Sequence, residues 1–136
     1  MVVSGSGCSS EDAGQTEMLP HKTIDDSRIS TLIICNSDAG NMSYQQISLA
    51  APQFRKDILL FVGSDDDRTP QWMSEKIYNA LPADINKKLS VHDGAGHGGA
   101  EFPFFVDWRR WAEETVGFMM ESSVILAKYM SQSIQK

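Results

Sequence analysis

A chain of 136 residues, of which 41% are hydrophobic and 22% charged, has the composition of one globular domain rather than a disordered or fibrous protein. Its net charge of −6 argues against a nucleic-acid partner, because phosphate backbones are bound by clustered Lys and Arg side chains. The longest apolar run, residues 58–62, is too short for a transmembrane segment. Cys8 and Cys35 belong to no pair or cluster with metal-ligand spacing, so we expect no metal site.

The N-terminal residues 1–22 have no apolar periodicity and are rich in Ser, Gly and Glu, so we expect a flexible lead-in. Small residues precede Cys8, as in bacterial lipoprotein signals, but the basic and apolar stretches of an export signal are missing. The sequence leaves both an exported and a cytoplasmic location open. Residues 23–136 are expected to form a single folded domain.

The first folded unit is expected to be a strand followed by a helix. Residues 28–35, RISTLIIC, are β-branched and almost continuously apolar, which is typical of a strand buried on both faces of a parallel sheet. A helix is predicted over residues 42–51, with Met42 and Leu49 along one side, and Pro52 ends it.

The second unit repeats this order. Residues 58–62 predict another buried strand, and residues 70–81 predict a helix with Thr69 as its N-cap and Pro70 as its first residue. The helical spacing predicts that one side of this helix faces the sheet through Met73, Ile77 and Leu81.

The last elements are a third strand and a long helix. Residues 88–92 predict a short strand, with His92 facing outward, and a helix is expected from Phe104 towards Met120 or Met130. Its apolar side is expected to consist of Phe104, Trp108, Trp111, Val116 and Met119. Strands that alternate with helices indicate an α/β domain with a short parallel sheet and flanking helices.

Three of the expected loops carry chemically reactive side chains. Ser37, Asp66 and His97 each follow a predicted strand, and the loops at the carboxyl ends of parallel strands emerge at one edge of the sheet. The chain order serine, aspartate, histidine is that of hydrolases in which an aspartate orients a histidine that deprotonates a serine. His97 stands among glycines, which leaves space for another group to approach.

Local sequence around each loop is compatible with these roles. A nucleophilic serine needs small residues two places before and after it, and here these are Cys35 and Ala39. The backbone amide of Asp38 would be one oxyanion donor. Asp66 has two rivals in the adjacent residues Asp65 and Asp67, and we expect one of the three carboxylates to turn inward.

The segments IDDSRISTLIICNSDAGNMSYQQISLAAP, DILLFVGSDDDRTPQWMSEKIYNALP and KKLSVHDGAGHG together resemble the α/β-hydrolase superfamily, especially its esterase and polyhydroxybutyrate-depolymerase-like branch. The resemblance covers roughly residues 24–120, and it implies Ser37 as nucleophile, Asp66 as acid and His97 as base. Ser37 and Asp66 are only 29 positions apart, and too few residues precede Ser37 for the several strands that the family has there. The resemblance therefore implies a truncated, carboxyl-terminal half of such a hydrolase, in which the first glycine of GxSxG is replaced by Cys35.

These features predict a serine carboxylic ester hydrolase that acts on a small-molecule ester through an acyl-enzyme and needs no cofactor. Weak or no activity is expected from the chain alone. The alternative is a catalytically silent α/β module that associates, for instance as a homo-oligomer, through an exposed sheet edge and its tryptophans, Trp72, Trp108 and Trp111. A flavodoxin-like phosphate-binding domain ranks last, because the loop NSDAGN has one glycine and no lysine.

Overall fold

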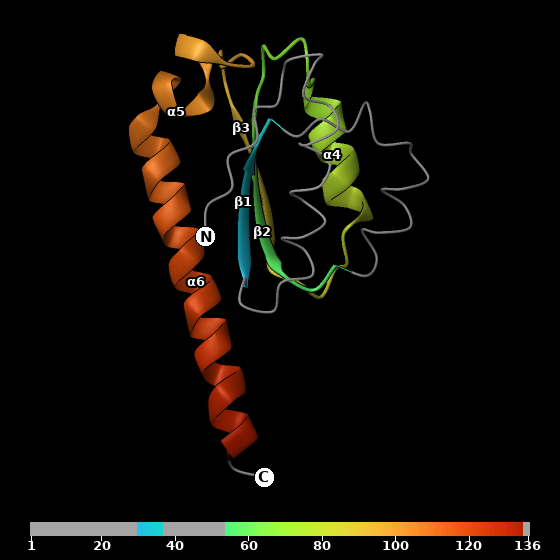
Figure 1. Ribbon diagram of the computed structural model, residues 1–136, viewed down its shortest axis with the longest axis vertical. Helices are drawn as coiled ribbons and strands as arrows, with labels where there is room; N and C mark the ends of the chain where they lie inside the picture. The colour runs from blue at the N-terminus through green and yellow to red at the C-terminus, as the bar shows by residue number, and fades with distance from the viewer. Residues whose placement is uncertain (1–29, 37–53, 135–136) are drawn as a thin grey trace, which may run out of the picture.

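The structure is a computed structural model that describes residues 30–36 and 54–134. The described residues form three layers, in which a parallel sheet lies between helix α4 (Gln71–Ala80) and helix α6 (Trp108–Ile134) (Figure 1). The prediction of an α/β domain with a short parallel sheet and flanking helices is confirmed. The predicted helix over residues 42–51 and the lead-in over residues 1–22 lie outside the described residues.

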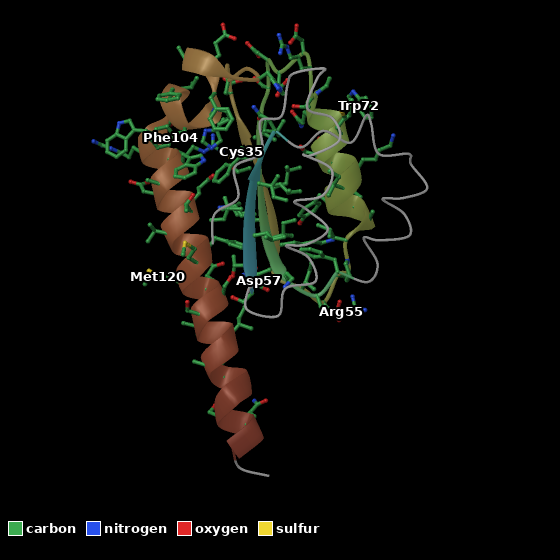
Figure 2. All side chains as sticks on the ribbon, in the orientation of Figure 1. Cys35, Arg55, Asp57, Trp72, Phe104 and Met120 are labelled. Carbon is green, nitrogen blue, oxygen red and sulfur yellow. The ribbon has the colours of Figure 1, made fainter. Side chains whose placement is uncertain are left out.

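The sheet contains three described strands in the order β1-β2-β3. They are β1 (Thr31–Cys35), β2 (Asp57–Gly63) and β3 (Lys87–His92), within a residue or two of the expected bounds where these can be compared. Both pairings are parallel, with Leu32 beside Ile58 and Phe61 beside Ser90. Figure 2 shows Asp57 at one end of the sheet and Cys35 at the other, so the carboxyl ends of the strands share one edge.

One face of the sheet packs against α4. Because side chains alternate across a strand, Leu32, Ile58 and Leu60 point to this face and form a core cluster with Phe54 and Leu81. The predicted inward side of the helix is confirmed, since Met73, Ile77 and Leu81 pack there.

The opposite face packs against α6. The alternate residues of the same strands point this way, and they form a second cluster with one residue of the helix: Ile33, Cys35, Leu59, Phe61 and Phe118. Trp111 joins this cluster and stacks on Phe61 with 5.6 Å between ring centroids. The central strand β2 is therefore buried on both faces, which explains its unbroken apolar sequence.

The long C-terminal helix differs from the prediction in two respects. Asp107, with φ −144° and ψ 75°, interrupts it and separates a short helix α5 (Pro103–Val106) from α6. The expected apolar side is also wrong for four of its five residues, because only Trp111 packs on the sheet and the others are largely exposed: Phe104, Trp108, Val116 and Met119. The face that meets the sheet instead carries Thr115, Phe118 and Ser122.

The C-terminal half of α6 extends beyond the amino ends of the strands (Figure 1). Met120 points away from the sheet in Figure 2 and is 65% exposed. In the part of the chain that the structure describes, no helix is long and apolar enough to cross a membrane.

Candidate active site

The loops that follow β2 and β3 are joined to each other by backbone hydrogen bonds. We call residues 64–69 the acid loop and residues 93–98 the histidine loop. The amide of Ser64 donates to the carbonyl of His92 at 3.0 Å, and that of Asp65 donates to the carbonyl of Ala95 at 2.9 Å. The amide of Gly94 in turn donates to the hydroxyl of Ser64 at 2.8 Å. Because of these bonds, the two loops form one hydrogen-bonded unit at the carboxyl ends of the strands.

A glycine makes this close approach possible. Gly63 is the last residue of β2, and a Cβ atom built on it would collide with the backbone carbonyl of Ala95. Only a residue without a side chain lets the strand end lie against the histidine loop.

Asp66 and His97 lie in contact within this unit. The Nδ1 atom of His97 is 3.1 Å from both carboxylate oxygens of Asp66. The Asp66 side chain is fully buried and that of His97 is 12% exposed, whereas the neighbouring carboxylates of Asp65 and Asp67 are exposed to solvent. A carboxylate only accepts hydrogen bonds, so this contact favours the imidazole tautomer with its proton on Nδ1 and its lone pair on Nε2.

Thr69 completes the contact between these two side chains. Its hydroxyl donates to Oδ2 of Asp66 at 2.7 Å and lies 3.2 Å from Nδ1 of His97. Its backbone amide also donates to Oδ1 of Asp66 at 2.7 Å. Since the hydroxyl proton is directed to Asp66, the oxygen lone pairs are available to the Nδ1 proton of His97.

The expected N-cap role of Thr69 is wrong. Pro70 is the N-cap of α4, the helix begins at Gln71, and no side chain caps it. The threonine hydroxyl lies instead between Oδ2 of Asp66 and Nδ1 of His97.

The environment of Asp66 keeps its carboxyl group ionised. Burial by itself would raise the pKa of Asp66, but the hydrogen bonds from the amide and hydroxyl of Thr69 and from His97 outweigh it. The pKa of this carboxyl group therefore lies below its ordinary value. At neutral pH a negatively charged acceptor therefore lies beside Nδ1 of His97.

Asn36 links the end of β1 to the histidine loop. Its Nδ2 atom donates to the backbone carbonyl of His97 at 2.7 Å and to that of Gly96 at 3.3 Å. Asn36 directly precedes Ser37 in the sequence, whereas Ser37 and Asp38, the expected nucleophile and oxyanion donor, lie outside the described residues. No local pattern in the sequence singles out Asn36 or the hydroxyl of Thr69, because both act through contacts between loops.

Cys35 is a second potential nucleophile near this edge, but its surroundings suppress its reactivity. It is buried against the helix α6 side of the sheet, and burial raises the pKa of its thiol to about 11. At neutral pH it therefore remains a thiol, which is a poor nucleophile.

His92 is not exposed, contrary to the expectation. Its side chain is 1% exposed, lies edge-to-face on Phe61 and has Nε2 3.6 Å from Glu114. The reason is that Ser90 and His92 share the face of β3 that α6 covers. Burial and the charge of Arg110 lower the pKa of His92, although Glu114 opposes this.

Glu114 lies at the centre of a polar cluster between β3 and α6. It accepts a short hydrogen bond from Ser90 and another from Nε of Arg110 at 3.3 Å, and Nζ of Lys88 lies 3.8 Å away. These contacts outweigh burial and lower the pKa of Glu114. The cluster attaches α6 to β3. Across residues 30–36 and 54–134, no group of three acidic, histidine or cysteine side chains is arranged to hold a metal ion.

Comparison with known proteins gives a distant structural likeness. The chain is similar to a cold-adapted esterase from an Arctic intertidal metagenomic library, solved in a PEG-bound complex, with a TM-score of 0.46 and 20% sequence identity. The likeness covers 68% of this chain and 40% of the esterase, so the chain spans about two fifths of that protein's length. No protein-family model matches the chain, and no curated protein does either.

Proposed function

We propose that the chain is a serine carboxylic ester hydrolase in which Ser37 is the nucleophile, His97 is the general base and Asp66 orients the histidine. The observation that carries this proposal is the contact of the buried Asp66 carboxylate with Nδ1 of His97 at the carboxyl edge of a parallel sheet. A histidine oriented in this way through Nδ1 presents Nε2 as a general base.

The proposed first half-reaction forms an acyl-enzyme. Nε2 of His97 takes the hydroxyl proton of Ser37 while the serine oxygen attacks the ester carbonyl carbon. The backbone amide of Asp38 stabilises the negative charge on the carbonyl oxygen of the tetrahedral intermediate. The intermediate collapses, and the imidazolium returns its proton to the departing alcohol, which leaves the acyl group on Ser37.

The second half-reaction releases the acid. His97 takes a proton from water, the resulting oxygen nucleophile attacks the acyl carbon, and the proton returns to the Ser37 oxygen as the carboxylic acid departs. Asp66 remains ionised throughout and stabilises the imidazolium, which its lowered pKa permits. Serine, histidine and aspartate suffice for this chemistry, so the proposal includes no cofactor.

A fluorophosphonate probe tests the nucleophile directly, because it phosphorylates an activated serine without any need for a particular ester. We expect labelling of the wild-type chain and none of Ser37→Ala. Asp66→Asn should retain the fold but label roughly 10³- to 10⁴-fold more slowly, because the amide no longer holds the imidazole in the reactive tautomer.

A matched control is Ser123→Ala. Ser123 is an exposed serine of α6 whose hydroxyl donates to the Met119 carbonyl at 2.9 Å, so its removal should leave labelling unchanged. Equal labelling of wild type and Ser37→Ala would refute Ser37 as the nucleophile. No labelling of a folded wild-type chain would favour the silent α/β module instead.

A further inference from the structure

Asn36 has an unusual position at the end of β1. It is 2% exposed, its amide donates to the carbonyl of Phe61 at 2.8 Å, and its φ is +50°. Among the described non-glycine residues it alone has a positive φ. Asparagine tolerates this left-handed conformation better than most residues, so the backbone turn at this position is compatible with the side chain.

The side-chain amide of Asn36 bridges two segments that are 60 residues apart. Both of its Nδ2 hydrogen bonds end on consecutive carbonyls of the histidine loop, those of Gly96 and His97. This loop has glycine at positions 94, 96 and 98, so its backbone has much conformational freedom to lose. The amide holds the backbone of the histidine itself, whereas Thr69 and Asp66 hold its ring.

We infer that Asn36 is a positioning residue that fixes the backbone of His97, and thereby sets the direction in which Nε2 of this histidine points. The inference concerns the contact between Asn36 and the histidine loop. Its consequence for catalysis rests on the proposed function, in which the residue after Asn36 is the nucleophile.

The chemistry of the site requires an amide at this position. Two carbonyl oxygens need two N–H donors from one short side chain, which an asparagine amide provides and an aspartate does not. An aspartate of the same size would direct a carboxylate at both carbonyls and repel them.

The test uses Asn36→Gly, which removes the amide and retains the freedom to adopt a positive φ. The first measurement is the ¹⁵N NMR spectrum of the His97 imidazole, which reports the populations of the two tautomers without any need for activity. We expect the Nδ1–H tautomer to dominate in the wild type and the two populations to become mixed in the variant. For ester hydrolysis, we expect kcat to fall roughly 10- to 100-fold with a smaller change in KM, as for a displaced catalytic group.

Asn86→Gly is the matched control. Asn86 precedes β3 at the amino ends of the strands, away from the candidate site, and its carbonyl accepts from the amide of Ile58 at 3.0 Å. The control variant loses the same side chain without any contact to the histidine loop, so the His97 spectrum and kcat should not change. If Asn36→Gly does not fold, Asn36→Asp replaces it and should mix the tautomers in the same way.

Unchanged His97 resonances in the folded Asn36 variant would overturn the inference, and so would an equal change in Asn86→Gly. The tautomer measurement tests the role of Asn36 independently of the proposed function. A folded wild-type chain that the fluorophosphonate probe does not label would contradict the hydrolase, whereas the tautomer measurement would still support or overturn the role of Asn36.

Discussion

Asp66 and His97 are 31 residues apart in the chain, yet their side chains meet at 3.1 Å in a single hydrogen-bonded unit. Two features bring them together. The parallel pairing of β2 and β3 places the two loops at one edge, and the backbone bonds from Ser64 and Asp65 hold the loops to each other. The contact is therefore a product of the fold rather than of side-chain flexibility.

The Thr69 hydroxyl should stabilise this unit. In Thr69→Val the buried carboxylate of Asp66 loses one donor, which should lower the free energy of unfolding at pH 7 by about 1.5–3 kcal/mol. The pKa of Asp66 should rise towards its ordinary value. The folded state lowers this pKa, so its contribution to stability is present above the unfolded value of 3.8 and is lost as the pH falls through the folded pKa.

Urea unfolding at pH 7 and at pH 3 checks this prediction. The difference between wild type and Thr69→Val should shrink at pH 3, and Thr69→Ser, which retains the hydroxyl, should lie close to the wild type. A valine variant as stable as the wild type at pH 7 would show that the hydroxyl contributes nothing to the unit.

Much of this architecture follows from sequence patterns of short range. Strand β2 is recognisable because it is buried on both faces and therefore apolar throughout, and α4 because its apolar residues recur at helical spacing. The long helix was harder to predict. It carries apolar residues on more than one side, so periodicity does not identify which side meets the sheet. The interruption at Asp107 also places Phe104 in a separate helix, α5.

The candidate site is predictable from the sequence only in part. The chain order of Ser37, Asp66 and His97 is visible in the sequence because each follows a strand. The contacts that support the pair come from different loops, as with the amide of Asn36, or from a residue whose local pattern suggests another role, as with Thr69. No local pattern encodes such contacts.

Gly63 should be intolerant of any side chain. In Gly63→Ala the new methyl group would collide with the Ala95 carbonyl, and relief requires the histidine loop to move away from β2. We expect a loss of about 3 kcal/mol in the free energy of unfolding, at the upper end for overpacked sites. Gly98→Ala is the control, because the structure has nothing within 4 Å of its Cβ position and its backbone is extended.

Chemical denaturation of both alanine variants measures the difference. Gly98→Ala should change the stability by less than about 1 kcal/mol. If the two variants were equally stable, the close packing of Gly63 against the histidine loop would not exclude a side chain at position 63.

The burial of His92 should make the fold sensitive to mild acid. Its pKa is lowered by burial and by Arg110, so the unfolded chain binds a proton at His92 at a higher pH than the folded chain does. The free energy of unfolding should therefore decrease as the pH falls below about 6.5, the ordinary histidine value. Glu114, whose pKa is lowered, stays ionised over this range.

His92→Phe tests this assignment, since phenylalanine can occupy the same place beside Phe61 and does not titrate. Urea unfolding at pH 7.5 and at pH 5.5 should show a smaller decrease for the variant than for the wild type. An identical decrease in both would assign the acid sensitivity to another group.

The last prediction concerns the attachment of α6. Phe118 is 2% exposed in the second core cluster, so Phe118→Ala should lower the free energy of unfolding by about 3–5 kcal/mol. Val116, two residues earlier on the same helix, is 56% exposed, and Val116→Ala should cost less than about 0.5 kcal/mol. Urea unfolding followed by circular dichroism compares the two, and similar losses would place a different face of α6 on the sheet.

The attachment of α6 also bears on the candidate site. Phe102 packs against the same cluster as Phe118, and it directly follows Glu101, whose carbonyl accepts from the amide of Gly96 in the histidine loop at 2.7 Å. A cavity at position 118 should therefore loosen the segment that leads back to His97. In Phe118→Ala the amide of Gly96 should exchange its hydrogen faster than in Val116→Ala, and equal exchange rates would show that the histidine loop is held independently of the helix.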